Sequence, residues 1–220
     1  MTTLTMPISA AAGLRLMPGF FERKHQEELV VVLREVVRRA PLFSPVMPGT
    51  AKPFSVRMTN CGPLGWVSDQ HGYRYRSTHP LTGESWPPIP AILARAWAEL
   101  THYPVPPQAC LVNYYGPTAR MGMHQDCDEE DLAAPVVSIS LGATCRFRIG
   151  ETVRSAPTRS FLLASGDVLV LGDASRLAFH GVDRIMAGTS TLLPDGGRIN
   201  LTLRRVSSPK TGCREETITS

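Results

Sequence analysis

Short apolar segments, separated by Gly, Pro and Asp, divide the sequence between residues 108 and 204. Each segment has the composition and length of a β-strand. Many short strands at fairly even spacing are typical of a sandwich or a barrel. We therefore expect a β-barrel in this half of the chain, with strands at 109–115, 136–141, 144–149, 160–163, 167–171 and 198–204.

The N-terminal half has a different pattern. A helix is expected from Glu22 to Arg39, because apolar residues recur at three- and four-residue spacing. This buried stripe comprises Leu29, Val32, Leu33, Val36 and Val37. A second helix is expected from about Pro90 to His102, and residues 63–90 between the helices are expected to be irregular and rich in aromatic side chains.

The fold class that follows is α+β, with both helices on one outer sheet. We expect N-terminal helices and an adjoining loop segment in residues 1–108, a β-core in 109–204 and a disordered tail in 205–220, all in one structural unit.

Composition excludes several classes of protein. The hydrophobic fraction of 43% and charged fraction of 19% are typical of globular domains, and no run approaches the roughly 18 apolar residues of a membrane span. The five cysteines are odd in number and lack the spacing of a zinc site, which favours reduced thiols. The N-terminus lacks the pattern of a signal peptide, so we expect a cytoplasmic location. The net charge of +4 includes only three lysines, and this arginine-rich balance is compatible both with nucleic-acid binding and with an ordinary solvated surface.

The most informative polar stretch is Met121–Glu129, where His124 and Asp126 are two residues apart. Alternate residues of an extended backbone lie on one face. A His and a carboxylate on one face, with a second His from elsewhere, can hold non-haem Fe(II) and leave coordination positions open. His180 is the best candidate for that second His, because it follows a strand and precedes Gly181. A His and an Asp at this spacing, or an isolated His, often have only a structural role. A zinc site is a further alternative.

Residues 198–204 alternate strictly between apolar and polar side chains. Ile199, Leu201 and Leu203 point one way, and Arg198, Asn200, Thr202 and Arg204 point the other. Such alternation usually marks a strand with one wet face. Two arginines, an amide and a hydroxyl on one face would also make a clamp for a dicarboxylate, because Arg binds carboxylates in a bidentate fork. Asn113 and Tyr115 offer a second polar face of the same kind.

Taken together, these segments resemble the AlkB family of Fe(II)- and 2-oxoglutarate-dependent dioxygenases. The HxDxDE block at His124–Glu129 and the NLTxR block at Asn200–Arg204 are the most specific. The matching blocks stand in the family's order and cover roughly residues 54–204. The other blocks are Met58–Gly62, Leu64–Trp66, Gly72–Tyr75, Trp86–Pro90, Cys110–Tyr115, Ala134–Gly142, Gly166–Val168 and His180–Gly181.

The resemblance implies a double-stranded β-helix, or jelly roll, with an N-terminal nucleotide-recognition lid. It implies that His124, Asp126 and His180 bind Fe(II). It also implies that 2-oxoglutarate is held by Asn113, Tyr115, Arg198, Asn200, Thr202 and Arg204. Which arginine takes which carboxylate stays open. The implied reaction uses O2 to demethylate N-alkylated bases such as 1-methyladenine and 3-methylcytosine, and releases succinate, CO2 and formaldehyde.

For the substrate, the resemblance implies that a flipped base lies between Trp66 and His124. Tyr73 and Tyr75 would contact the nucleotide backbone, and Asp128 would meet the exocyclic amine of a cationic methylated base. The implied partner is alkylated single- or double-stranded DNA, with RNA as an extension, and the implied state is a monomer.

The chain departs from the family pattern at one place, and three alternatives stay open. Bacterial relatives carry an arginine near the damaged base at the position aligned with Ser160, where this chain has Arg159 as the neighbour. A shift of one residue on a strand reverses the face, which puts the base preference in doubt. The alternatives are the same iron chemistry on tRNA, the same chemistry on protein, and a non-enzymatic nucleic-acid binder.

Overall fold

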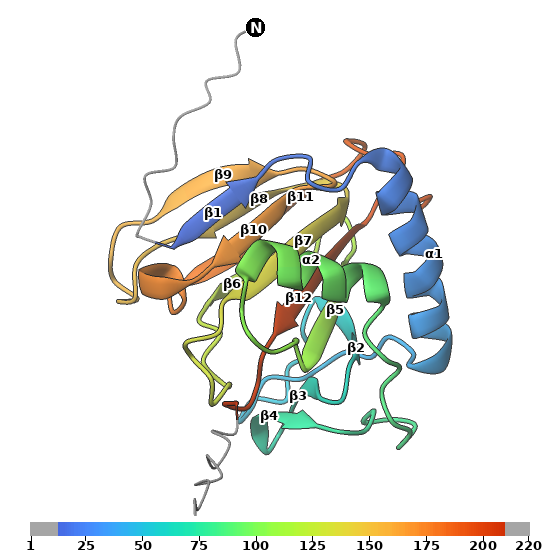
Figure 1. Ribbon diagram of the computed structural model, residues 1–220, viewed down its shortest axis with the longest axis vertical. Helices are drawn as coiled ribbons and strands as arrows, with labels where there is room; N and C mark the ends of the chain where they lie inside the picture. The colour runs from blue at the N-terminus through green and yellow to red at the C-terminus, as the bar shows by residue number, and fades with distance from the viewer. Residues whose placement is uncertain (1–12, 210–220) are drawn as a thin grey trace, which may run out of the picture.

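The computed structural model describes residues 13–209, in which two antiparallel sheets face each other (Figure 1). The larger sheet has six strands in the order β1-β10-β7-β12-β5-β2. The smaller has four in the order β6-β11-β8-β9. The large-sheet strands are β1 Leu14–Met17, β10 Val168–Leu171, β7 Val136–Gly142, β12 Arg198–Arg204, β5 Ala109–Tyr115 and β2 Val56–Cys61. The small-sheet strands are β6 Met121–His124, β11 His180–Met186, β8 Thr144–Ile149 and β9 Arg159–Leu163.

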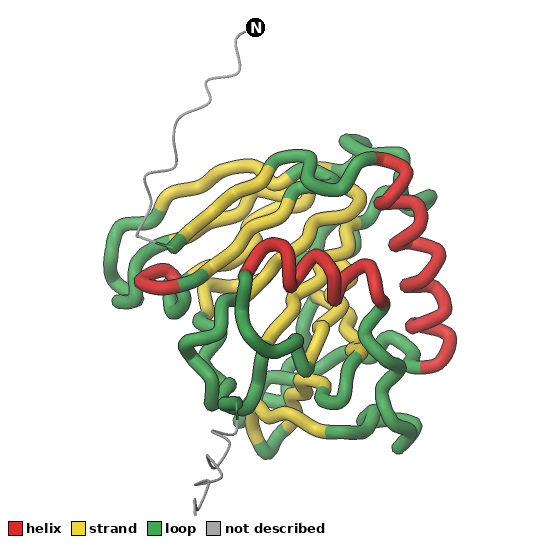
Figure 2. The backbone as a smooth tube through the Cα atoms, viewed as in Figure 1, coloured by secondary structure: helices red, strands yellow, loops and turns green. Residues whose placement is uncertain are grey.

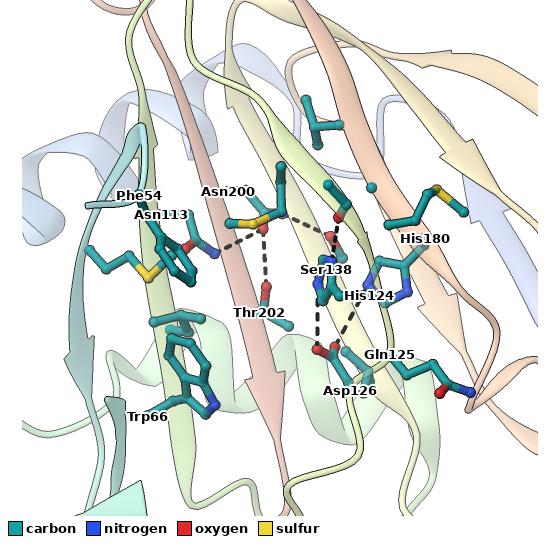
Figure 3. A pocket seen from close by; sticks show the side chains of 18 of the residues that line it. Phe54, Trp66, Asn113, His124, Gln125, Asp126, Ser138, His180, Asn200 and Thr202 are labelled. Atoms are coloured by element: carbon teal, nitrogen blue, oxygen red, sulfur yellow. Dashed lines mark hydrogen bonds and ion pairs between the residues drawn. The ribbon is translucent and has the colours of Figure 1, made fainter. Parts of the chain in front are cut away.

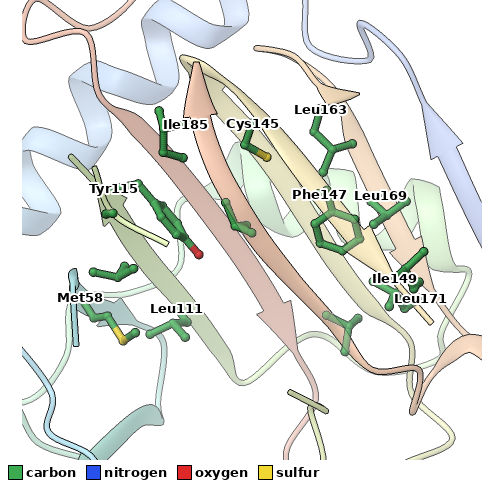
Figure 4. Close-up of a cluster of buried hydrophobic side chains, with 14 of the residues drawn as sticks. Met58, Leu111, Tyr115, Cys145, Phe147, Ile149, Leu163, Leu169, Leu171 and Ile185 are labelled. Carbon is green, nitrogen blue, oxygen red and sulfur yellow. The ribbon is translucent and has the colours of Figure 1, made fainter. Parts of the chain in front are cut away.

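One hydrophobic core lies between the two sheets (Figure 4). Met58, Leu111 and Tyr115 enter it from the large sheet, and Phe147 and Ile149 enter it from the small sheet. The β-core of short strands expected from the sequence is therefore confirmed, and its two facing sheets form the jelly roll that the resemblance implied.

A second core lies under two helices on the outer face of the large sheet (Figure 2). These helices are α1 Arg23–Arg39 and α2 Ala91–Thr101, and both were expected to cover one outer sheet. Trp97 of α2 is 1% exposed and packs with the apolar face of β12. The buried stripe of α1 differs from the expected one: Gln26 and Val30 are buried, whereas Val32 is 37% exposed and Val37 is half-buried.

Strand β12 lies in the middle of the large sheet, between β5 and β7. Its register sets Asn200 opposite Asn113 of β5 and Ser140 of β7. The polar face of β12 points into the interior, since Arg198 is 1% exposed and Arg204 is 6% exposed. The interpretation of this strand as a surface strand with one wet face is therefore wrong.

The segment that was expected to be irregular contains a hairpin. Strands β3 Gly65–Asp69 and β4 Gly72–Arg76 pair with Trp66 opposite Tyr75. The side chain of Asn60 fixes this hairpin to β2: its Nδ2 donates to the Trp66 carbonyl, and its Oδ1 accepts from the Trp66 amide, both at 3.0 Å. The hairpin lies within the N-terminal part of the chain, where the lid was expected. Its role as a lid stays a prediction.

The expected internal boundaries need two corrections. Because β1 and β2 belong to the same sheet as β12, a boundary at residue 108 cuts through that sheet. The expected disorder from Arg205 onward is wrong for the first residues: Val206 is 7% exposed, and its amide donates to Gln108 Oε1 at 3.0 Å. Residues 210–220, the rest of that expected tail, lie outside the described residues.

No helix in the described part of the chain has the length and apolar character needed to cross a membrane. The four cysteines within that part, Cys61, Cys110, Cys127 and Cys145, are free thiols. A small 3-10 helix, Asp173–Ser175, connects β10 to the segment before β11.

Candidate metal centre and adjoining cavity

A cavity of about 780 Å³ opens between the two sheets, and the polar face of β12 forms one of its walls (Figure 3). Every predicted ligand of iron and of 2-oxoglutarate lines this cavity, as do Trp66, Tyr73 and Asp128. Residues that are far apart in the sequence are thus brought to one place by the packing of the two sheets.

His124, Asp126 and His180 form one cluster whose candidate ligand atoms all lie within 4.8 Å of one another. The Nε2 atom of His124 lies 3.8 Å from Asp126 Oδ1, and the Nε2 atom of His180 lies 3.9 Å from Asp126 Oδ2. The two histidines are direct cross-strand partners on β6 and β11. Two imidazoles and one carboxylate on one side of a point match a facial triad, with room for further ligands opposite.

Both histidines are held in the tautomer that a metal needs. The Nδ1 atom of His124 lies 2.9 Å from the Gly122 carbonyl oxygen, and that of His180 lies 2.9 Å from the Ala178 carbonyl oxygen. A carbonyl oxygen can only accept, so each Nδ1 carries the proton. Each Nε2 therefore presents its lone pair to the centre.

The charge states also suit a cation. Burial raises the pKa of the Asp126 carboxyl, but the charge of Arg204, followed by His180 and His124, outweighs burial and holds that pKa well below its usual range. Burial lowers the pKa of His180 to about 4. The cluster therefore has an ionised carboxylate and a neutral His180 at neutral pH.

Asp126 reaches this place from a loop. Strand β6 ends at His124, so the expectation that His124 and Asp126 share one face of an extended segment is wrong in detail. Arg176 holds the loop: its Nη1 donates to the Asp126 carbonyl at 2.6 Å, its Nε donates to the Ala134 carbonyl at 2.8 Å, and its Nη2 lies 3.0 Å from Glu129 Oε2. Arg176 and Glu129 were not expected to be part of the site, because an arginine in a loop and one acid in an acidic run give no pattern.

Arg198 provides a test of whether an anion fits the cavity. Its side chain is 1% exposed, and its Nη2 donates to Ser140 Oγ at 2.8 Å. Its Nε and Nη1 are buried and have no hydrogen-bond partner. A buried cation with free donors is costly unless an anion accompanies it, so the residues fit a carboxylate ligand.

Neighbouring polar groups would complete that ligand site. Asn200 Nδ2 donates to Ser138 Oγ at 2.8 Å, and Thr202 Oγ1 donates to Asn200 Oδ1 at 3.0 Å. Asn113 Oδ1 is buried without a partner. Burial raises the pKa of the Tyr115 hydroxyl, which therefore stays protonated as a donor. Ser138 and Ser140 were not expected; their signal is the period-two position of both serines within the apolar segment 136–142.

Arg204 differs from Arg198, since it already has partners in the protein. Its Nη2 donates to Asp126 Oδ1 at 2.7 Å, and its Nε lies 3.5 Å from Glu129 Oε1. The two predicted clamp arginines are therefore not equivalent: Arg198 has two buried donors without a partner, whereas Arg204 has one, at Nε, and is tied to a candidate metal ligand through Nη2.

The predicted substrate residues divide into two groups. Trp66 Nε1 donates to Asp128 Oδ2 at 2.7 Å, and Tyr73 stacks on the Trp66 ring with centroids 5.4 Å apart. Tyr75 does not line the cavity, and its hydroxyl donates to Glu129 in the interior. Its contact with a nucleotide backbone stays a prediction without support from its position.

Arg154 is one of four arginines that line the cavity, with Arg120, Arg198 and Arg204. Neither Ser160 nor Arg159, both on β9, lines the cavity, whereas Arg154 does. The Arg154 guanidinium lies over the Phe179 ring at 4.6 Å, and its Nη1 donates to the Met123 carbonyl at 3.2 Å. The sequence did not single out Arg154, which brings a cationic side chain to the cavity.

Comparison with known proteins adds independent findings. The model of the 2OG-Fe(II) oxygenase superfamily matches residues 13–204. A protein of Caulobacter vibrioides named alpha-ketoglutarate-dependent dioxygenase AlkB homolog is 50% identical over 202 residues, which are 92% of this chain and 91% of that protein. The tRNA demethylase abh1 of Schizosaccharomyces pombe is 39% identical over 83 residues, which are 38% of this chain and 28% of that protein. The solved structure of OsALKBH1 superposes with a TM-score of 0.76 at 29% identity, over 88% of this chain and 96% of that one.

Proposed function

The chain belongs to the AlkB family within the 2OG-Fe(II) oxygenase superfamily, and from this premise we propose that it removes N-methyl groups from cationic bases in nucleic acid. Membership makes it an alpha-ketoglutarate-dependent dioxygenase that uses Fe(II), 2-oxoglutarate and O2. The bases we propose are 1-methyladenine and 3-methylcytosine, and the products are succinate, CO2, formaldehyde and the unmodified base.

The observation that carries the choice of substrate is the position of Asp128 beside Trp66 at the cavity. Methylation at these ring nitrogens gives the base a positive charge that the unmodified base lacks. A carboxylate near a flipped cation favours it over the neutral base, and an indole offers a surface for stacking. Asp128 and Trp66 provide both contacts from neighbouring positions.

The roles of the remaining residues follow from their placement. His124, Asp126 and His180 would hold Fe(II), which when bound supplies the oxidising chemistry at the methyl group. Arg198, Tyr115, Asn113, Asn200, Thr202 and Arg204 would hold 2-oxoglutarate. Because Arg198 has free donors deep in the cavity, we assign it the carboxylate that lies far from the metal. Arg204 beside Asp126 then takes the carboxylate near the metal.

A second candidate substrate is RNA. The support for it is the similarity to a tRNA demethylase, and the cavity residues do not distinguish a ribose from a deoxyribose. We propose DNA as the main substrate and RNA as a second one, with the protein acting as a monomer in the cytoplasm. Sedimentation of the purified full chain tests the monomer, and cell fractionation tests the location.

The decisive experiment measures formaldehyde and succinate release from oligonucleotides that contain one lesion. The lesions are 1-methyladenine and 3-methylcytosine, each in single-stranded DNA, double-stranded DNA and RNA, with Fe(II) and 2-oxoglutarate. Formaldehyde from the DNA substrates supports the proposal. Consumption of 2-oxoglutarate without demethylation of any oligonucleotide contradicts it.

Aspartate 128 has a matched control in the same run of acids. D128N is expected to lower kcat/KM for 3-methylcytosine by about tenfold or more, because it removes one charge from the contact with a cationic base. E130Q removes the same charge at a position that does not line the cavity, and its kcat/KM is expected to equal that of the unmodified protein.

A further inference from the structure

The outer face of the small sheet carries three arginines. Along β8, Cys145, Phe147 and Ile149 point into the core, so Arg146 and Arg148 point outward. On β11, Ile185 points into the core and Arg184 is exposed. We call Arg146, Arg148 and Arg184 the arginine face.

Two of these arginines oppose each other directly. Arg184 and Arg146 are cross-strand partners in the register of β11 and β8. Like charges in opposite positions of an antiparallel pair destabilise the sheet. Within residues 13–209, neither side chain has an ion pair or a hydrogen bond that would offset this repulsion.

In the part of the chain that the structure describes, Asp183 is the only acid that forms an ion pair with the arginine face. Asp183 Oδ1 lies 2.9 Å from Arg148 Nη2, and Arg148 keeps a buried Nε without a hydrogen-bond partner. Both helices pack on the other sheet, so neither covers these side chains. The arginine face therefore presents an excess of positive charge to solvent at a cost to stability.

This positive charge continues toward the mouth of the cavity. Arg148 lies opposite Gly181 of β11, and β6 is the next strand. Two strand spacings, roughly 10 Å, thus separate Arg148 from β6. At that edge Arg154 donates to the Met123 carbonyl and lines the cavity. Cationic groups therefore lie both at the cavity and on the outer face of the small sheet.

We propose that the arginine face binds the sugar-phosphate backbone of the nucleic acid strand whose damaged base enters the cavity. This inference rests on the proposed function. Guanidinium groups bind phosphates through paired hydrogen bonds, and a polyanion turns the repulsion between Arg146 and Arg184 into a shared attraction. Side chains two residues apart on a strand are about 7 Å apart, so the face can contact successive phosphates of one strand.

The test is the salt dependence of binding to an undamaged 20-nucleotide single strand, measured by fluorescence anisotropy with the full chain. Each phosphate contact contributes about 0.7 to the slope of log K against log salt for single strands. R146Q/R184Q is therefore expected to lower the slope by about 1.4. If the variant and the unmodified protein bind the strand equally near 1 M salt, the variant binds it about 25-fold more weakly at 0.1 M salt.

A matched control removes two exposed arginines from the helices. R34Q/R95Q lowers the net charge by the same amount at positions on α1 and α2. It is expected to keep the slope of the unmodified protein. R146K/R184K retains both charges at the arginine face and is expected to keep the slope as well.

Equal slopes for R146Q/R184Q and R34Q/R95Q overturn the proposal; a face that binds an acidic protein instead of nucleic acid gives this result. Weaker binding by R146Q/R184Q would not be explained by unfolding of this variant. Removal of the two opposed charges should leave its melting temperature unchanged or raise it. The binding assay needs no turnover. Absence of formaldehyde in the demethylation assay would therefore contradict the proposed function without changing the measured salt dependence of binding.

Discussion

Arg204 and Asp126 form a buried ion pair in which Nη2 and Oδ1 are 2.7 Å apart and both side chains are 7% exposed. One partner is a candidate ligand of the metal, and the other is a candidate ligand of 2-oxoglutarate. The two binding sites are therefore joined by a direct contact.

Loss of this pair is expected to destabilise the metal-free protein. R204M leaves the Asp126 carboxylate buried without its main counter-charge, and a broken buried pair costs about 3 kcal/mol or more. Urea unfolding of the metal-free variant should show this loss. An unfolding free energy equal to that of the unmodified protein would show that the pair is not stabilising.

Arg198 is expected to behave in the opposite way. R198M removes a buried cation that has two donors without partners, so the unfolding free energy should stay the same or rise. The KM for 2-oxoglutarate should rise about tenfold to a hundredfold, because hydrogen bonds between charged groups are lost. Metal affinity, measured with Mn(II) in the absence of 2-oxoglutarate, should not change. A KM within twofold of the original value would remove Arg198 from the 2-oxoglutarate site.

Gly181 is expected to control the position of His124. A Cβ at residue 181 would lie 2.7 Å from the Met121 carbonyl oxygen, so G181A must push β6 away from β11. Since the two histidines face each other across these strands, Mn(II) affinity should fall by about tenfold or more. G122A is the matched control, because a Cβ there meets nothing within 4 Å. Equal metal affinities of the two variants would contradict this role.

The stability of the metal-free protein should decrease as the pH is lowered from about 6.5 to about 4. The pKa of His180 is about 4 in the folded state, against an ordinary value of 6.5. Between these values the unfolded chain binds a proton that the folded chain does not, so stability is highest above pH 6.5 and falls toward pH 4. The total is on the order of 3 kcal/mol. H180F should flatten this dependence in urea titrations between pH 7 and 4, and H25F, which changes an exposed histidine of α1, should retain it.

Strands with a strong apolar composition were predictable, because burial on both sides of the large sheet leaves a clear record in the sequence. Four of the six residues of β5 and β12 that were assigned to 2-oxoglutarate follow from alternation on β12 alone. Strand β6 was missed, since four residues with a glycine have no detectable period. The β3–β4 hairpin was missed because a short strand with an intermediate burial pattern does not alternate.

The site was predictable where it depends on strands and resemblance, and unpredictable where it depends on loops. His124 and His180 are neighbours because of the register between β6 and β11. Their residue types were sufficient to predict a metal site. Arg176, Glu129 and Arg154 act through loop positions, and no local pattern indicates which distant group a loop side chain will contact. Arg198 has two buried donors without a partner, and Arg204 has one but is paired with Asp126 through Nη2. These differences depend on three-dimensional neighbours, so the sequence treats the two arginines alike.

The register of strand β12 determines what packs under the helices and what lines the cavity. Its seven residues place apolar side chains under the helices and polar side chains in the cavity. A pairing error of one residue would bury the arginines under the helices and leave the cavity with Ile199, Leu201 and Leu203. Such a molecule would lose the co-substrate site and the helical layer together. The stability of the fold and the presence of the co-substrate site therefore depend on the same strand register.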